Sequence, residues 1–256
     1  MSELRRPVYR GASWSAFAVL VLIAIQLVVF AVWPPPGSAE AWLDVFARSP
    51  LLGLINADAL YLVSTVLLIP VYLGLAVRLA AEEPALALGG VTAGLVSVVT
   101  FVPSNVAAEL WDLAGRASAG AEREVVIGAV EATLARSSGS AFLVSYVLGG
   151  VALLLFALAL RRTGVWGPAA WRTCGVAGVL MLVPSTVGVV GVVFSLVSLV
   201  PWVWFCVLAV RRLGDDAAAC LLPARPVGLE DLEEPAEAGR LEGWAQSPSR
   251  SAMPRS

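Results

Sequence analysis

TCGVAGVLMLVPSTVGVVGVVFSLVSLVPWVWFCVLAV, residues 173–210, is a run of 38 residues without one charged side chain. A helix rises about 1.5 Å per residue, so such a helix would be almost twice as long as the ~30 Å hydrocarbon core of a bilayer. We therefore expect the run to cross a membrane, turn and cross back. The turn is predicted at Pro184-Ser185-Thr186-Val187-Gly188, because proline and glycine interrupt a helix.

The composition of the whole chain agrees with a membrane protein. Of its 256 residues, 59% are hydrophobic and only 14% are charged, and the mean hydropathy is +0.83. A soluble domain carries about a quarter charged residues, and a disordered chain is far less hydrophobic. The net charge of −2 argues against nucleic acid as a partner. We expect an all-α polytopic bundle whose first partner is the lipid bilayer.

Four further uncharged stretches, 11–39, 59–77, 84–108 and 137–160, complete the membrane domain. A charged residue at the centre of a span costs about 2.5–3.5 kcal/mol, so these stretches mark the spans. The sequence predicts an N-terminal segment over 1–13, a membrane domain over 14–213 and a tail over 214–256. The six predicted spans are about 14–33, 59–79, 86–107, 139–160, 170–186 and 189–211.

The first span has a rival interpretation. Arg5 and Arg6 precede an apolar run, and Ala39-Glu40-Ala41 resembles the Ala-x-Ala site of a cleavable signal peptide. The apolar run before Pro34 is longer than such a peptide needs, which favours a membrane span.

Arginines predict the orientation of the bundle. Six crossings place both termini on one side, together with nine arginines near helix ends, whereas the opposite loops hold four. Because cytoplasmic loops are enriched in basic residues, we expect cytoplasmic termini in a plasma membrane. The nine are Arg5, Arg6, Arg10, Arg78, Arg161, Arg162, Arg172, Arg211 and Arg212, and the four are Arg48, Arg116, Arg123 and Arg136.

Two outer loops carry helical patterns. Trp42, Val45 and Phe46 share one helical face, which fits either a short interfacial helix or a plain surface loop. Over 121–136, apolar side chains recur at helical spacing, and an amphipathic helix is predicted there on the outer mouth of the bundle.

The acidic tail over 214–256 lacks the apolar residues for a core and is expected to be disordered. A protein partner could bind the tail or the outer helix; the plainer alternatives are a solvated extension and a packing helix.

Several kinds of chemistry are excluded by composition. The chain has no histidine, and all seventeen basic residues are arginine. It therefore has no Ser-His-Asp triad, no histidine-bound metal and no lysine for a Schiff base. Cys174, Cys206 and Cys220 form no Cys-x-x-Cys pair, and no disulfide framework is expected. We predict no cofactor, no metal site and no enzymatic activity.

Small residues recur at helical spacing in three spans. Gly90 and Gly94 form one pair, Ala141, Ser145 and Gly149 a second stripe, and Gly191, Ser195 and Ser198 a third. Small residues let membrane helices approach closely. We expect contacts within the chain, with a dimer face as the alternative.

Polar residues collect at the predicted outer ends of the spans. Glu109 follows Asn105 by four residues, which would place both on one helical face. If the spans are neighbours, these residues line an outward-facing vestibule that binds a polar or cationic group. The alternative is ordinary helix capping and solvation at the interface. The candidates are Asn56, Asp58, Tyr61, Ser104, Asn105, Glu109, Ser145, Tyr146 and Thr186.

Four segments together resemble a known family. They are LLGLINAD (51–58), SNVAAEL (104–110), GSAFLVSYVLGG (139–150) and SLVSLVPW (195–202), the last followed by Arg211-Arg212-Leu213. This pattern resembles the bacterial integral membrane family catalogued as domain of unknown function 4386. The resemblance covers about residues 14–213 and implies six spans in a bacterial plasma membrane. It implies no activity, cofactor or catalytic residue.

The function favoured by these observations is that of a membrane scaffold, accessory or regulatory subunit without enzymatic activity. The alternative is a transporter of a small solute or lipid that uses the vestibule. A closed, dry interior would argue against transport, and a continuous polar path would favour it.

Overall fold

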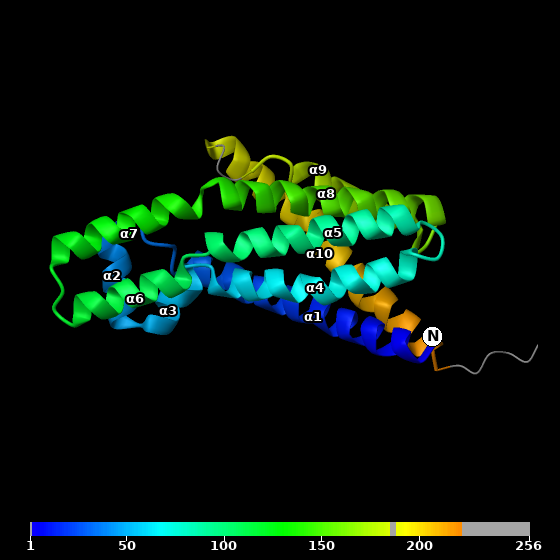
Figure 1. Ribbon diagram of the computed structural model, residues 1–256, viewed down its shortest axis with the longest axis horizontal. Coiled ribbons are helices and arrows are strands. Elements are labelled where there is room, and N and C mark those ends of the chain that lie inside the picture. Colours follow the sequence, from blue (N-terminus) through cyan, green and yellow to red (C-terminus); the bar gives the residue numbers. More distant parts are fainter. Residues whose placement is uncertain (1, 185–187, 222–256) are drawn as a thin grey trace, which may run out of the picture. The chain divides into compact units, whose positions relative to one another are not determined.

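The computed structural model describes residues 2–184 and 188–221, and in this part of the chain all the regular elements are helices (Figure 1). The prediction of an all-α polytopic membrane bundle is confirmed. The helices are α1 (Ser2–Val32), α2 (Ala39–Arg48), α3 (Pro50–Asn56), α4 (Ala59–Leu79), α5 (Pro84–Phe101), the 3-10 turn η1 (Val102–Ser104), α6 (Ala107–Ser118), α7 (Arg123–Ser137), α8 (Ser140–Thr163), α9 (Gly167–Leu180) and α10 (Gly188–Ala219).

Six of these helices form a ring in chain order. Each of α1, α4, α5, α8, α9 and α10 packs against the next, and α10 closes the ring on α1. Neighbours run in opposite directions: Gly74 of α4 lies against Ala12 near the start of α1, and Ser13 donates a hydrogen bond to the carbonyl oxygen of Val210 at 2.8 Å. The chain thus reverses direction at every step around the ring.

The 38-residue run folds back as predicted. Helix α9 ends at Leu180 and α10 begins at Gly188, while 185–187, which include Thr186, lie outside the described residues. Five helical segments are long and apolar enough to cross a membrane. With 14 residues, α9 reaches only about 21 Å, less than the hydrocarbon core. The total of six crossings therefore stays a prediction.

Glycines bring the ring helices into close contact. A Cβ atom at Gly94 would lie 2.6 Å from the ring of Tyr72, and one at Gly178 would lie 3.0 Å from the carbonyl oxygen of Gly150. Tyr72 in turn stacks on Phe156 with ring centroids 5.9 Å apart. The small residues of α5 and α8 therefore mediate contacts within the chain, as expected.

The interior of the ring is filled by side chains. Leu75, Phe156, Leu160 and Leu213, from three different helices, are fully buried and belong to one apolar cluster. Close packing of this kind leaves little room for water.

The first and last helices extend beyond the range predicted for the membrane domain, 14–213. The segment 1–13 is not separate, because α1 begins at Ser2 and Tyr9 and Ala12 are already buried in the bundle. Helix α10 continues to Ala219, beyond the predicted start of the tail. There Asp216 accepts a contact from Arg78 at 3.5 Å and one from the Trp166 indole at 3.4 Å. The rest of the tail, 222–256, lies outside the described residues.

The nine arginines named above lie at or near one end of the ring, the arginine-rich end, where α1 and α9 begin and α4, α8 and α10 end. Ion pairs across this end, Arg78–Asp216 and Arg162–Glu83, join helices that are distant in sequence. The predicted grouping of arginines is therefore confirmed.

Helices α2, α3, α6 and α7 pack together at the opposite end as a folded cap (Figure 1). Trp42, Phe46, Leu110 and Val130 are among the buried residues of its apolar core. The predicted helix over 121–136 corresponds to α7, and the segment around Trp42 is helix α2 rather than a surface loop. Helices α3 and α6 were not predicted.

Candidate functional site

Asp58 lies where the cap meets the bundle, directly before α4. Its backbone has the left-handed conformation, with φ of 62°, which aspartate and asparagine tolerate better than most residues. This conformation turns the chain sharply between α3 and α4. Asn56, at the end of α3, is buried.

Gln26 of α1 joins this turn and was missed by the sequence analysis. Its side chain is buried, and its Nε2 donates to the carbonyl oxygen of Ile55 at 3.0 Å and lies 3.5 Å from Oδ1 of Asp58. An amide inside a membrane span needs a partner, because lipid offers none. The isolated glutamine in the uncharged run 11–39 was the signal that could have identified it.

Asn105 ties the same turn to the cap. Its Nδ2 donates to the carbonyl oxygen of Asp58 at 3.1 Å and contacts that of Ala57 at 3.4 Å. Its Oδ1 accepts the backbone N–H of Ala107, the first residue of α6, at 3.1 Å. We call Gln26, Asn56, Asp58 and Asn105 the junction, because they connect α1, α4 and the cap.

Two buried oxygens of the junction are left without a partner. Among the described residues, no donor lies within hydrogen-bond distance of Oε1 of Gln26 or Oδ1 of Asn56. A buried polar atom without a partner is costly. With the Asp58 carboxylate, the junction therefore offers acceptor oxygens to a water or to another hydrogen-bond donor.

The Asp58 carboxyl titrates unusually for an aspartate. Its side chain keeps exposed surface at the edge of the bundle. Nevertheless, the surrounding protein atoms remove enough water to raise the pKa of Asp58 from 3.8 to about 6. Desolvation disfavours the charged form of an acid, so the carboxyl changes its charge near neutral pH.

Glu109 does not share a helical face with Asn105, contrary to the prediction. Asn105 is in an extended conformation, with ψ of 128°, and a new helix, α6, begins at Ala107. The third span, predicted over 86–107, thus ends earlier, at Phe101, and Pro103 lies in the 3-10 turn that follows. The Glu109 carboxylate instead accepts a hydrogen bond from Arg136 and forms an ion pair between α6 and α7 on the surface of the cap.

The other candidate residues are held elsewhere. Tyr61 packs edge-on against Phe101 with ring centroids 5.1 Å apart, and Ser104 donates to the Phe101 carbonyl oxygen at 2.7 Å. The carbonyl oxygen of Ser145 accepts from Ser97 at 2.8 Å, while Tyr146 and Ser195 share a hydrogen bond of 2.7 Å. Of the nine predicted residues, the junction brings together Asn56, Asp58 and Asn105.

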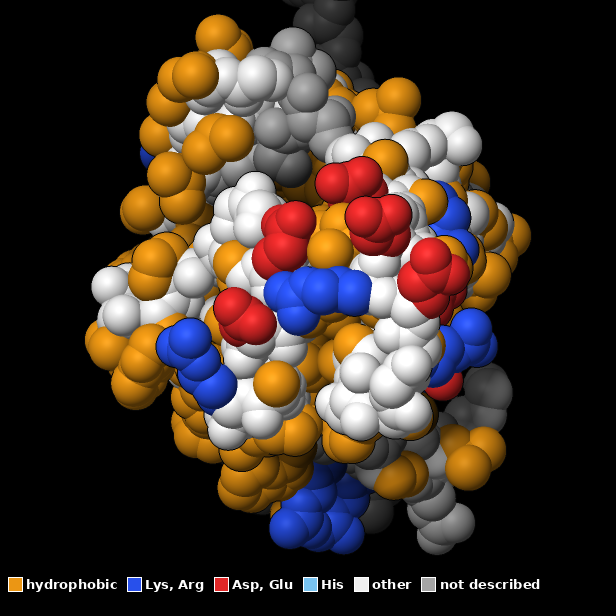
Figure 2. Space-filling view, turned by 90° about the vertical axis from the view of Figure 1, so that its left-hand side faces the viewer, with side chains coloured by type: hydrophobic (Ala, Val, Ile, Leu, Met, Phe, Trp, Pro, Cys, Tyr) orange, Lys and Arg blue, Asp and Glu red, His pale blue; other side chains and the backbone are white. Residues whose placement is uncertain are grey.

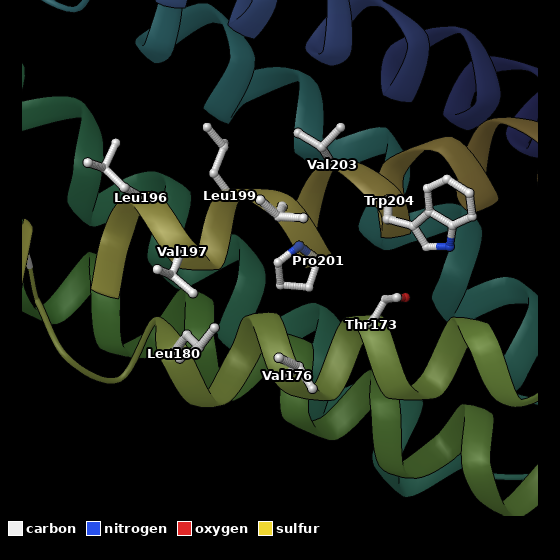
Figure 3. Close-up of a pocket in the computed structure, with 10 residues that line it drawn as sticks. Thr173, Val176, Leu180, Leu196, Val197, Leu199, Pro201, Val203 and Trp204 are labelled. Atoms are coloured by element: carbon white, nitrogen blue, oxygen red, sulfur yellow. The ribbon is translucent and has the colours of Figure 1, made fainter. Parts of the chain in front are cut away.

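A surface groove lies away from the junction. It has a volume of about 980 Å³, runs between α9 and α10, and is lined almost entirely by apolar side chains such as Val176, Val197 and Trp204 (Figure 3). Pro201 interrupts the backbone hydrogen bonding of α10 beside it. A groove of this composition suits hydrocarbon rather than a polar solute.

Within the described part of the chain, no three Cys, Asp or Glu side chains lie together where they could hold a metal ion. Cys174 and Cys206 are buried in the ring. Compared with known proteins, the chain matches no family model, no curated protein and no solved structure, so the resemblance to a family stays a prediction.

Proposed function

We propose that this protein is a membrane scaffold or accessory subunit without enzymatic activity, and that its cap binds a protein partner. The observation that carries the proposal is the cap itself. It is a folded unit with its own apolar core, although the spans could be joined by short loops. The binding of a partner to the surface of the cap would explain why the chain keeps a folded unit of this size outside the ring.

The packed ring supports the same proposal. Large side chains such as Phe156 and Leu75 fill its interior, and the uncharged stretches of the sequence contribute no carboxylate or arginine to mid-depth. Coupled transporters commonly keep an ionisable residue there. Ser97 and Tyr146 are hydrogen-bonded between helices rather than arranged along a path.

The outer face of the cap has the properties of a protein-binding surface. Acidic and basic side chains gather on it with apolar side chains beside them (Figure 2). Trp111 and Val125 are more than half exposed, and exposed aromatic residues are enriched at interfaces. Eight acidic residues of the cap and junction stand against four arginines, which favours a basic partner surface: Glu40, Asp44, Asp58, Glu109, Asp112, Glu122, Glu124 and Glu131 against Arg48, Arg116, Arg123 and Arg136.

We also propose a bacterial plasma membrane with both termini in the cytoplasm. The grouping of nine arginines at the end of the ring where α1 begins and α10 ends supports this orientation. Reporter fusions after Gly120, between α6 and α7, and after Leu221 test it. A reporter active only in the cytoplasm should work at Leu221 and fail at Gly120; the reverse result would overturn the orientation.

Site-specific crosslinking tests the proposed partner. A photoreactive residue in place of Trp111 or Val125 should yield one stoichiometric protein adduct in native membranes. The same residue in place of Val99, which is 69% exposed on the ring helix α5, should yield lipid adducts only. The partner identified in this way should lose binding to the full chain when Glu40→Arg and Asp44→Arg are combined on α2.

Absence of any protein adduct from the cap positions, or equal adducts from cap and ring, would contradict the proposal. Partner binding that survives the charge reversal would show that the acidic face of α2 takes no part.

A transporter is the second candidate, favoured by the two unpartnered oxygens of the junction. Asp58→Asn and Glu109→Gln separate the alternatives. If the junction binds a transported solute, Asp58→Asn should abolish transport of that solute. Glu109→Gln should not, because Glu109 lies in an ion pair on the surface of the cap. If both variants fold and behave as the wild type, the junction is only structural.

A further inference from the structure

Trp171, near the start of α9, is flanked by two arginines. The guanidinium carbons of Arg161, in the last turn of α8, and of Arg172 each lie 5.3 Å from the centroid of the Trp171 ring. Contacts of this kind between guanidinium groups and indole rings are attractive. They hold two positive charges beside one aromatic side chain at the arginine-rich end.

Arg161 and Arg172 differ from Arg78 and Arg162, the two arginines at this end that form ion pairs. Arg78 pairs with Asp216 and Glu82, and Arg162 pairs with Glu83. Among the side chains that the structure describes, residues 4–184 and 188–221, neither Arg161 nor Arg172 has a carboxylate within ion-pair distance, and both side chains are exposed. Their charge is therefore available to an anion from outside the bundle.

An apolar groove begins at the same place. It has a volume of about 350 Å³ and runs along the outer side of α8 and α9, from Trp171 and Arg172 towards Val179 and Leu180. Gly175 is part of its lining. From Arg172 to Leu180 the helix rises about 12 Å, so the groove points from the arginine-rich end into the hydrocarbon region.

We propose that this groove binds an anionic phospholipid. Arg161 and Arg172 bind the phosphate, and one acyl chain lies along Gly175 and Val179. Arginine recognises phosphate through several N–H donors, and tryptophan suits the boundary between headgroups and hydrocarbon. Two positive charges without a nearby carboxylate select a lipid with net negative charge over a zwitterionic one.

A soluble phosphate would use only the two arginines and leave the groove unused, because the groove residues other than Arg172 are apolar or aromatic. The commitment to a lipid therefore rests on the combination of charge and apolar surface. It is independent of the proposed partner of the cap, which lies at the other end of the bundle.

Quenching of Trp171 by brominated lipids tests the proposal. The full chain is placed in phosphatidylcholine vesicles that contain increasing amounts of phosphatidylglycerol brominated on one acyl chain. The contribution of Trp171 is the difference between the wild type and Trp171→Phe. We expect brominated phosphatidylglycerol to quench this component at a much lower mole fraction than brominated phosphatidylcholine does.

The variant Arg161→Gln with Arg172→Gln should weaken phosphatidylglycerol binding about 30-fold, roughly fivefold for each arginine near a charged surface. Arg161→Gln alone should give the fivefold loss. The matched control Arg211→Gln with Arg212→Gln removes two charges from the same end without touching Trp171 and should change binding less than about twofold.

Equal quenching of the Trp171 component by the two lipids would overturn the proposal. So would an equal effect of the two double variants, because general surface charge would then explain the binding. Inorganic phosphate at millimolar concentration should leave the quenching unchanged; displacement of the lipid by free phosphate would show a site for a soluble anion instead.

Discussion

Nε2 of Gln26 on α1 donates a hydrogen bond to the carbonyl oxygen of Ile55 in α3 and lies 3.5 Å from the carboxylate of Asp58. One buried side chain thus connects the first span to the turn between the cap and α4. Both contacts require an N–H donor at this position of the Gln26 side chain. Replacement by the isosteric glutamate removes that donor and so tests the contacts.

Gln26→Glu should destabilise the protein by about 1.5–3 kcal/mol at pH 7.5, because it removes the donor and adds a carboxylate beside Asp58. The loss should shrink at pH 5, where the carboxyl groups become protonated, and it should shrink also when Asp58→Asn is combined with it. Thermal unfolding in detergent, followed by a thiol-reactive dye at the buried Cys174 and Cys206, provides the measurement. An equal loss at both pH values, unaffected by Asp58→Asn, would show that charge is not the cause.

Asp58→Asn alone should raise the unfolding temperature at pH 7.5. The pKa of Asp58 is raised in the folded protein to about 6 from 3.8, so between these values the folded state holds a proton that the unfolded state has lost. By linkage, the folded state therefore loses stability as the pH rises through this interval. Below it, Asp58 is protonated in both states and this loss is absent. Asparagine also tolerates the left-handed backbone. The difference between variant and wild type should therefore shrink as the pH falls from 7.5 to 4; a difference independent of pH would contradict the shift.

Ser97→Ala should destabilise the contact between α5 and α8. Ser97 is buried and donates to the Ser145 carbonyl oxygen of the neighbouring helix at 2.8 Å. Hydrogen bonds between membrane helices contribute about 0.6 kcal/mol on average and up to about 2 kcal/mol. Thr100→Val is the matched control, because the Thr100 hydroxyl donates to carbonyl oxygens of its own helix. Unfolding free energies in a denaturing detergent titration should separate the two variants, and equal losses would argue against an interhelical role for Ser97.

Gly178→Ala should destabilise the contact between α8 and α9 by about 1–3 kcal/mol, since overpacking forces the backbones apart. Its Cβ would lie 3.0 Å from the carbonyl oxygen of Gly150 and 3.1 Å from the backbone nitrogen of Leu154. Gly175→Ala on the same helix is the control: its Cβ would meet the Ala157 side chain at an ordinary 3.5 Å and should leave stability nearly unchanged. The same dye assay measures both, and a neutral Gly178→Ala would mean that α9 can move freely away from α8.

The places where the sequence analysis failed share a physical cause. Asn105 and Glu109 are four residues apart, and only the 3-10 turn that holds Pro103 after the end of α5 and the start of α6 separate their faces. Gln26 gave no periodic signal, and its importance comes from Ile55 and Asp58, which are distant along the chain. Helix α3 has only seven residues, too few for a hydrophobic period to be recognised.

By itself, the sequence determined that the chain is a helical membrane bundle, where its apolar segments lie, and which end collects the arginines. Those properties follow from the cost of placing charge in hydrocarbon, which acts on each segment separately. Tertiary structure alone decided that the six helices close into a ring, that four short helices form a cap, and that Gln26 meets Asp58. These features depend on which surfaces fit together across long sequence separations, and hydropathy carries no information about that fit.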